Sequence, residues 1–145
     1  HGFMPIVVKV VEQEEYNQWV DEKKQAAIKM AELTTKDWTA QELVERGESV
    51  YAVNCVACHQ TNGQGIPGIF PALAGSDIVM NNKDKNIEIL MEGVQGAAMN
   101  SFSYLSEVEL AAVITYTRQS WGNAENGDGE IVVPKDIVDY KKPKI

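Results

Sequence analysis

The sequence predicts an all-α fold in which three main helices form one compact domain, an extra helix precedes it, and both ends are flexible. Apolar residues recur at helical spacing in separate segments of the 145-residue chain. Two of these segments begin with a capping box, Thr39 with Glu42 and Ser106 with Glu109, which satisfies the first free amides of a helix. A chain of this length holds one domain with extensions, because it cannot bury two full cores.

Two different patterns precede the compact domain. Residues 5–11 are mostly β-branched and predict a strand. Residues 12–33 predict an amphipathic helix, which belongs to a linker that we place at 12–39. Its apolar positions are Tyr16, Trp19, Val20, Ala27 and Met30. We expect this apolar stripe to pack on a neighbouring element.

The compact domain is expected at residues 40–121. Its first helix follows the capping box at Thr39 and carries Leu43, Val44, Gly47, Val50 and Tyr51 on one face. The other two helices are expected at 86–94 and 106–121, with Gly- and Pro-rich loops at 60–75 and 95–104. Residues 122–145 show no period and are expected to form a flexible tail.

The most informative motif is Cys55-Val56-Ala57-Cys58-His59, where the first helix ends. Two thiols three positions apart add across the two vinyl groups of one porphyrin, and the adjacent imidazole reaches the iron from the same helical turn. This order and spacing predict one covalent haem c, attached at Cys55 and Cys58, with His59 as an axial iron ligand. The porphyrin also explains the long loops, because it fills part of the core itself.

Two other kinds of site use similar residues. A thioredoxin-like dithiol has two cysteines at this spacing, but it lies in a βαβ pattern that this sequence lacks. A zinc site needs a second pair of ligands, and the chain has 2 Cys and 2 His in total. Covalent haem implies a periplasmic or other extracytoplasmic protein. No signal peptide is visible, so we expect a mature product or an excised piece.

An electron-transfer haem needs a second axial ligand from the protein. The other imidazole is that of the first residue, His1, so a methionine thioether is favoured. Met99 follows the small residues 96–98, which let the backbone pass close to a flat ring, and it precedes the last helix. Met91 lies on a helix face, and Met80 precedes a polar stretch. We therefore predict Met99 as the second ligand.

With these residues, about 80 positions of the chain resemble a class I cytochrome c. Gly47 and Tyr51 match the glycine and the aromatic residue of that family's N-terminal helix. Val113 and Tyr116 match residues of the C-terminal helix that crosses it. The resemblance implies that the glycine lets the two helices approach closely.

The same resemblance implies a hydrogen bond from His59 to the carbonyl oxygen of a proline, which would orient the ring and raise its basicity. Pro71 resembles the family's proline, and Pro67 is the other candidate. One departure is Asn100, where many bacterial relatives have proline after the methionine. That change leaves the ligand loop less rigid but keeps the sulfur of Met99.

The first residues resemble a second family. His1-Gly2-Phe3-Met4 and the apolar residues after them are similar to the end of the copper-binding loop in subunit II of haem–copper oxidases, whose pattern is C-x3-C-x3-H-x2-M. Segments 70–76 and 115–121 resemble cytochrome domains fused to that subunit. The resemblance implies that residues 1–11 are a remnant of the CuA cupredoxin domain. His1 and Met4 would be CuA ligands only in the intact subunit, because bridging two copper ions requires thiolates.

The resemblance therefore implies an electron carrier with no catalysis of its own, within cytochrome c oxidase as the parent enzyme of a respiratory chain. The domain would pass single electrons from a donor cytochrome c, or a similar redox protein, to the CuA domain and then to subunit I. The parent would be anchored in the bacterial inner membrane. The alternative is a free-standing periplasmic electron shuttle or a dehydrogenase cytochrome subunit. An open-iron peroxidase or gas sensor and a thiol–disulfide oxidoreductase are the remaining rivals.

The charge balance indicates what the chain binds. The formal net charge of −8 at pH 7 disfavours binding to nucleic acid and to anionic membranes. A basic protein partner is the natural complement, so we expect electron entry from a basic donor to slow as ionic strength rises. We expect the piece itself to be soluble and monomeric.

Overall fold

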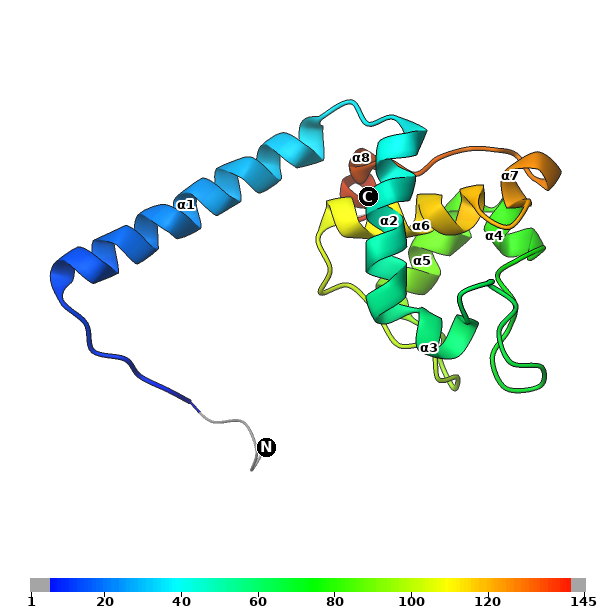
Figure 1. The fold of residues 1–145 in the computed structure, drawn as a ribbon, viewed down its shortest axis with the longest axis horizontal. Helices are drawn as coiled ribbons and strands as arrows, with labels where there is room; N and C mark the ends of the chain where they lie inside the picture. The colour runs from blue at the N-terminus through cyan, green and yellow to red at the C-terminus, as the bar shows by residue number, and fades with distance from the viewer. Residues whose placement is uncertain (1–5, 142–145) are drawn as a thin grey trace. The chain divides into compact units, whose positions relative to one another are not determined.

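The computed structural model describes residues 6–141, and that part of the chain contains eight helices (Figure 1). The chain divides into two compact units, His1–Leu33 and Thr34–Ile145, which we describe separately. The helices are α1 (Gln13–Thr35), α2 (Ala40–Asn54), α3 (Val56–His59), α4 (Asp77–Asn81), α5 (Lys83–Glu92), α6 (Glu107–Gln119), α7 (Asn123–Asn126) and α8 (Pro134–Lys141). The predicted all-α class is confirmed.

The described part of the first unit consists of α1 and the segment before it. α1 lies where the linker helix was predicted, and none of its residues is buried. The predicted strand is wrong for residues 6–11, which have no regular structure. Ile6 and Val10 are 94% and 93% exposed. A lone segment has no partner for its backbone N–H and C=O groups, so β-branched composition alone does not make a strand.

The core of the second unit is built around the crossing of α2 and α6 (Figure 1). Leu43 on α2 and Leu110 and Ile114 on α6 are at most 1% exposed. A Cβ atom on Gly47 would lie 2.1 Å from the carbonyl oxygen of Ala112, so only glycine permits this approach. The prediction that Gly47 marks the helix crossing is confirmed.

Both predicted capping boxes are present, at Thr39 with Glu42 before α2 and at Ser106 with Glu109 before α6. In each box the hydroxyl accepts from the backbone N–H three residues on, and the carboxylate accepts from the backbone N–H of the cap. They set the starts of the two crossing helices. The middle helix α5 begins earlier than predicted, because the Asn82 side chain caps it by accepting from the Lys85 amide.

The segment after α6 folds back onto the second unit. Val132 and Ile137 are 0% exposed and belong to the core. The hydroxyl of Thr115 on α6 donates to the carbonyl oxygen of Val132 at 2.9 Å and accepts from its amide at 2.9 Å. The expectation of a flexible tail at 122–145 is therefore wrong for the described residues up to Lys141. The segment has no sequence period because short pieces of it pack separately.

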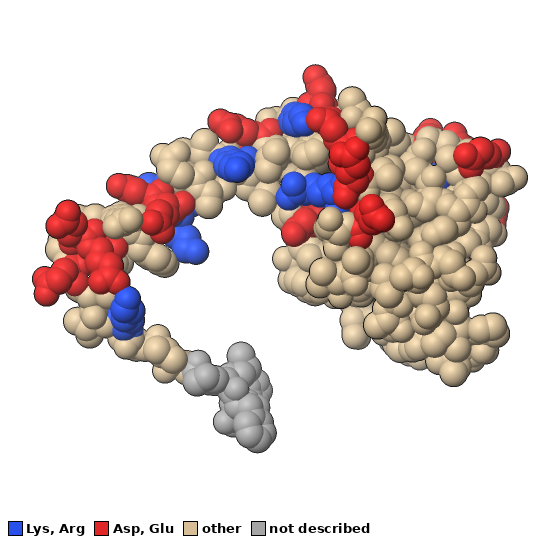
Figure 2. All heavy atoms as spheres, in the orientation of Figure 1, with Lys and Arg blue, Asp and Glu red and all other residues tan. Residues whose placement is uncertain are grey.

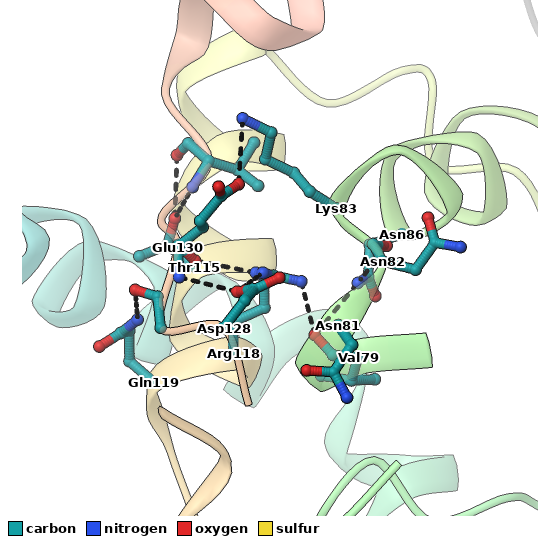
Figure 3. Close-up of polar contacts among 12 residues, drawn as sticks. Val79, Asn81, Asn82, Lys83, Asn86, Thr115, Arg118, Gln119, Asp128 and Glu130 are labelled. Carbon is teal, nitrogen blue, oxygen red and sulfur yellow. Dashed lines mark hydrogen bonds and ion pairs between the residues drawn. The ribbon is translucent and has the colours of Figure 1, made fainter. Parts of the chain in front are cut away.

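A buried arginine connects this C-terminal segment to the helices (Figure 3). Arg118 on α6 is 2% exposed. Its guanidinium donates to the carbonyl oxygens of Val79 at 2.7 Å and Glu130 at 2.9 Å, and it forms an ion pair with Asp128. One side chain thus joins α6, the middle of α4 and the loop before α8.

Candidate functional site

The cysteine motif lies where α2 ends. Cys55 is the C-cap residue of α2, and α3 is the short helix Val56–His59 that follows it. The backbone amide of His59 donates to the carbonyl oxygen of Cys55 at 2.9 Å. Cys55 and Cys58 are free, half-buried thiols. The local helix therefore places both thiols and the imidazole on one compact segment.

Burial raises the pKa of the Cys55 thiol to about 11, and the neighbouring Cys58 adds to the shift. A thiol with a raised pKa stays protonated near neutral pH. Thiol–disulfide oxidoreductases instead use an exposed cysteine whose pKa is lowered. This electrostatic environment argues against a redox dithiol and fits a structural or attachment role.

The imidazole of His59 is held by the loop that follows it. His59 is 7% exposed, and its Nδ1 lies 3.0 Å from the carbonyl oxygen of Pro71. This bond needs the proton on Nδ1, which leaves the lone pair of Nε2 for a metal ion. Of the two candidate prolines, Pro71 rather than Pro67 is the hydrogen-bond acceptor.

Glycines in the loop let its backbone reach the histidine. Gly65 donates from its amide to the carbonyl oxygen of His59 at 3.0 Å. It has a positive φ of 63°, and a Cβ there would lie 2.5 Å from the carbonyl oxygen of Pro71. The backbone amides of Ile66 and Phe70 donate to each other's carbonyl oxygens, at 2.9 Å and 2.8 Å. The carbonyl oxygen of Pro71 is thus presented by a tightly folded loop.

An aromatic cluster packs next to the motif, and the sequence pattern did not predict it as a unit. The rings of Tyr51 and Tyr116 lie 5.2 Å apart, and Trp121 lies 5.4 Å from Tyr51 and 5.7 Å from Tyr116. The Tyr51 hydroxyl donates to the carbonyl oxygen of Gln60 at 2.7 Å. A Cβ on Gly63 would lie 2.5 Å from the Trp121 ring. Gly63, in the Gly-rich loop, was the sequence signal for this last contact.

The three methionines of the domain have different surroundings. Met91 on α5 packs against the core. Met80 lies in the last turn of α4, and its carbonyl oxygen accepts from the amide of Asp128 at 3.3 Å. Met99 is half-buried outside that core, in a turn closed by a hydrogen bond from the Val94 amide to the Met99 carbonyl oxygen. The second axial ligand therefore stays a prediction, with Met99 as the candidate.

The loop that carries Met99 is connected to the cysteine motif. The Tyr104 hydroxyl donates to the side-chain oxygen of Asn54 at 3.2 Å, and Asn54 directly precedes Cys55. The Ser101 hydroxyl donates to the carbonyl oxygen of Met91 at 2.6 Å. The loop is therefore held at one end to α5 and at the other to α2.

The segments around the motif carry no charge. Residues 49–76 and 93–106 contain no Asp, Glu, Lys or Arg, and we call their combined surface the charge-free face. Figure 2 shows charged side chains gathered elsewhere, while the lower part of the larger unit, where α3 lies, carries neither sign. Exposed apolar side chains on this face include Val53 at 84% and Ile69 at 70%.

The donor set fits a covalent haem c. It offers two free thiols at the required spacing, an imidazole whose Nδ1 already has an acceptor, and a thioether on a separate loop. Helices α2 and α6, the motif and these loops together define a cytochrome c domain.

The match to known families agrees with this class. Residues 42–116 match the family described as cytochrome C oxidase, cbb3-type, subunit III, and the chain belongs to it. Cytochrome c-552 of Thermus thermophilus is 38% identical over 97 residues, which are 57% of this chain and 73% of that protein.

Two longer relatives are dehydrogenase subunits. The cytochrome c subunit of alcohol dehydrogenase (quinone) from Gluconobacter oxydans is 32% identical over 92 residues, 56% of this chain and 19% of that protein. The gluconate 2-dehydrogenase cytochrome c subunit of Pantoea cypripedii is 32% identical over 110 residues, 68% of this chain and 24% of that protein. The chain therefore spans only a fraction of these subunits.

The predicted copper ligands His1 and Met4 lie outside the described residues. The matches reported above include no subunit II of an oxidase. None of the helices within residues 6–141 is long and apolar enough to cross a membrane.

Proposed function

We propose that this chain carries single electrons between two redox proteins through one haem c. Cys55 and Cys58 attach the haem, and His59 and Met99 are its axial ligands. The observation that carries the proposal is the bond between His59 Nδ1 and the Pro71 carbonyl oxygen, because it leaves Nε2 free for iron. When bound, the haem takes up or releases one electron.

Groups of the protein set the reduction potential, which says how readily that electron is held. Pro71 raises the basicity of the His59 ring, which favours the oxidised state. The neutral thioether of Met99 favours the reduced state, as do the apolar residues packed around the motif. With His59 and Met99 both holding the haem, no iron position would remain open for a substrate, which would separate this function from that of a peroxidase or gas sensor.

The relatives favour a shuttle or a dehydrogenase subunit as the context of this electron transfer. A cytochrome c-552 and two dehydrogenase cytochrome subunits are 32–38% identical to the chain over 92–110 residues. In that setting the chain is an extracytoplasmic carrier whose partners are other redox proteins.

A second context, the tail of an oxidase subunit II, rests on residues 1–8. Their similarity to the end of a CuA loop suggests a domain upstream, and α1 belongs to a unit separate from the haem domain. In this context electrons pass from a donor cytochrome to the CuA domain and then to subunit I. His1 and Met4 complete CuA only together with two upstream cysteines.

The ligand assignment is tested by Met99→Ala, with Met80→Ala and Met91→Ala as matched controls. We expect Met99→Ala to abolish the sulfur-to-iron charge-transfer band of the oxidised protein, and to give a high-spin spectrum that responds quickly to cyanide. The two controls should keep the band. A band that survives in Met99→Ala, or disappears only in Met80→Ala, would show that another residue is the ligand.

The context is tested by the parent reading frame. Cysteines eight and four positions before His1, after β-strand patterns and a membrane hairpin, would establish the oxidase subunit. A secretion signal in the same place, without those cysteines, would establish the separate carrier.

A further inference from the structure

A buried asparagine in the C-terminal segment contacts the loop that presents Pro71. Asn123, the first residue of α7, is 1% exposed. Its side-chain amide donates to the carbonyl oxygens of Leu73 at 3.1 Å and Thr117 at 2.8 Å. Its side-chain oxygen accepts from the backbone amide of Gly75 at 2.8 Å. The whole side-chain amide is thus used to join the end of α6 to residues 73–75.

Both backbone polar groups of Leu73 form hydrogen bonds. Its amide donates to the carbonyl oxygen of Gly63 at 2.7 Å, while its carbonyl oxygen accepts from Asn123. Before Pro71, the reciprocal bonds between Ile66 and Phe70 hold the other side of the loop. Pro71 has no amide N–H of its own to anchor it. The position of its carbonyl oxygen therefore depends on these flanking bonds.

We propose that Asn123 is a positioning residue for His59. It holds Leu73 and Gly75, these hold the segment that starts at Pro71, and the Pro71 carbonyl oxygen accepts the Nδ1 proton of His59. The inference rests on the proposed role of His59 as an axial ligand. It gives the C-terminal segment a part in setting the redox property of the site.

Removing Asn123 leaves the Leu73 carbonyl oxygen and the Gly75 amide without their partner. The loop then samples other positions, and the bond from His59 Nδ1 to Pro71 weakens. A less basic imidazole stabilises the oxidised state less, so the midpoint reduction potential shifts to more positive values. The Nδ1 proton of His59 also becomes more accessible to solvent.

The test uses the haem-loaded protein with Asn123→Ala and the milder Asn123→Ser, whose smaller side chain leaves less of the space empty. Two readouts are measured: the midpoint potential, and the exchange rate of the His59 Nδ1 proton by NMR. We expect a positive shift of the potential in both variants, larger for Ala, and proton exchange about tenfold faster, as loss of one hydrogen bond gives.

Two asparagines serve as matched controls. Asn126 lies on the same short helix, and its side-chain amide donates to the carbonyl oxygen of Gly122 at 2.7 Å. Asn86 is buried, and its amide donates to the carbonyl oxygens of Ile78, Val79 and Asn82. Asn86→Ala should lower stability without moving the potential, which separates positioning from general loosening of the fold.

The inference is overturned if Asn123→Ala folds and keeps both the potential and the Nδ1 exchange rate of the wild type. It is also overturned if the Gly75 amide of the wild type exchanges as fast as an exposed amide, a measurement that needs no variant. Neither outcome would contradict the proposed function. That function instead fails if the wild-type spectrum lacks histidine and methionine ligation.

Discussion

Two regions of the second unit are held together in different ways. The charge-free face around Cys55 is shaped by backbone hydrogen bonds, glycines and aromatic contacts. The C-terminal segment from 122 to 141 is held by the buried side chains of Val132 and Ile137 and by polar side chains, above all the buried Arg118 and its ion pair with Asp128. The two regions meet at Asn123, which belongs to the second and bonds to the first.

This difference shows which region of the second unit uses charged side chains and which region has none. Near the proposed haem, the loop holds its form without ion pairs, so the site stays apolar and the electron is exchanged across an uncharged surface. In the C-terminal segment, charged groups act together with buried apolar side chains. We therefore expect the C-terminal segment to respond to charge changes, and the loop to respond to added bulk.

The largest effect is expected for Arg118→Met, which tests the C-terminal segment. The substitution removes the Arg118 donor from the carbonyl oxygens of Val79 and Glu130 and removes the ion-pair partner of Asp128. Each hydrogen bond lost from the buried, charged guanidinium costs about 1.5–3 kcal/mol of the free energy of unfolding. Chemical denaturation measures the loss. Arg118→Lys keeps the charge but not the fork of donors, so it should recover only part of the stability.

The next effect is expected for Gly65→Ala, which tests the loop. The new Cβ would lie 2.4 Å from the carbonyl oxygen of Phe70 and 2.5 Å from that of Pro71, at a positive φ of 63°. Left-handed backbone and overpacking together cost about 2–4 kcal/mol. Gly68→Ala is the matched control, because its φ is 77° and nothing lies within 4 Å. A loss equal in the two variants would mean that backbone strain alone matters, and that the close approach does not.

Acid is expected to weaken the C-terminal segment by a smaller amount, through Asp128. Burial raises the pKa of this carboxyl, but hydrogen bonds from the Glu130 amide and from Arg118 outweigh it, so the pKa is lowered from 3.8. A lowered folded-state pKa stabilises the protein above pH 3.8 and loses that effect as pH falls further. The difference in unfolding free energy between wild type and Asp128→Asn should therefore shrink as pH falls below about 4. A constant difference would show that the charge of Asp128 contributes nothing.

Much of the haem domain was predictable because its signals are local. A capping box needs only residues three positions apart, so Thr39 and Ser106 located the starts of α2 and α6. The cysteine motif is likewise a short spacing rule. Gly47 was assigned by resemblance, and the structure supplies its physical reason in the 2.1 Å approach to Ala112.

The C-terminal segment was not predictable in the same way. Val132 and Ile137 are buried by α6, from which they are separated in sequence, and no period marks them. In the sequence, Arg118 has the pattern of a solvated basic residue at a helix end. In the structure, its guanidinium donates to the carbonyl oxygens of Val79 and Glu130. The predicted strand is wrong over the described residues 6–11 for the opposite reason. The composition suits a strand, but strand pairing needs a partner that composition does not reveal.

The smallest effect concerns the charge-free face, and it is measured as a rate. Ile69→Lys and Glu45→Gln each change the net charge by one unit. Ile69 lies on the face, 70% exposed and two residues before Pro71. Glu45 is exposed on α2, ten residues before Cys55, which is about 15 Å along the helix.

At moderate ionic strength a charge acts over about 10 Å, so the local charge governs a small reagent that exchanges electrons at this face. We expect Ile69→Lys to speed reduction by an anionic small-molecule donor and to make the rate fall as the salt concentration rises, while Glu45→Gln leaves the rate and its salt dependence nearly unchanged. Equal changes of rate in the two variants would mean that the rate depends on the net charge of −8 rather than on the local charge of the face. Electrostatic docking of a basic protein donor then becomes the better account, because long-range attraction and not the uncharged surface would set the encounter.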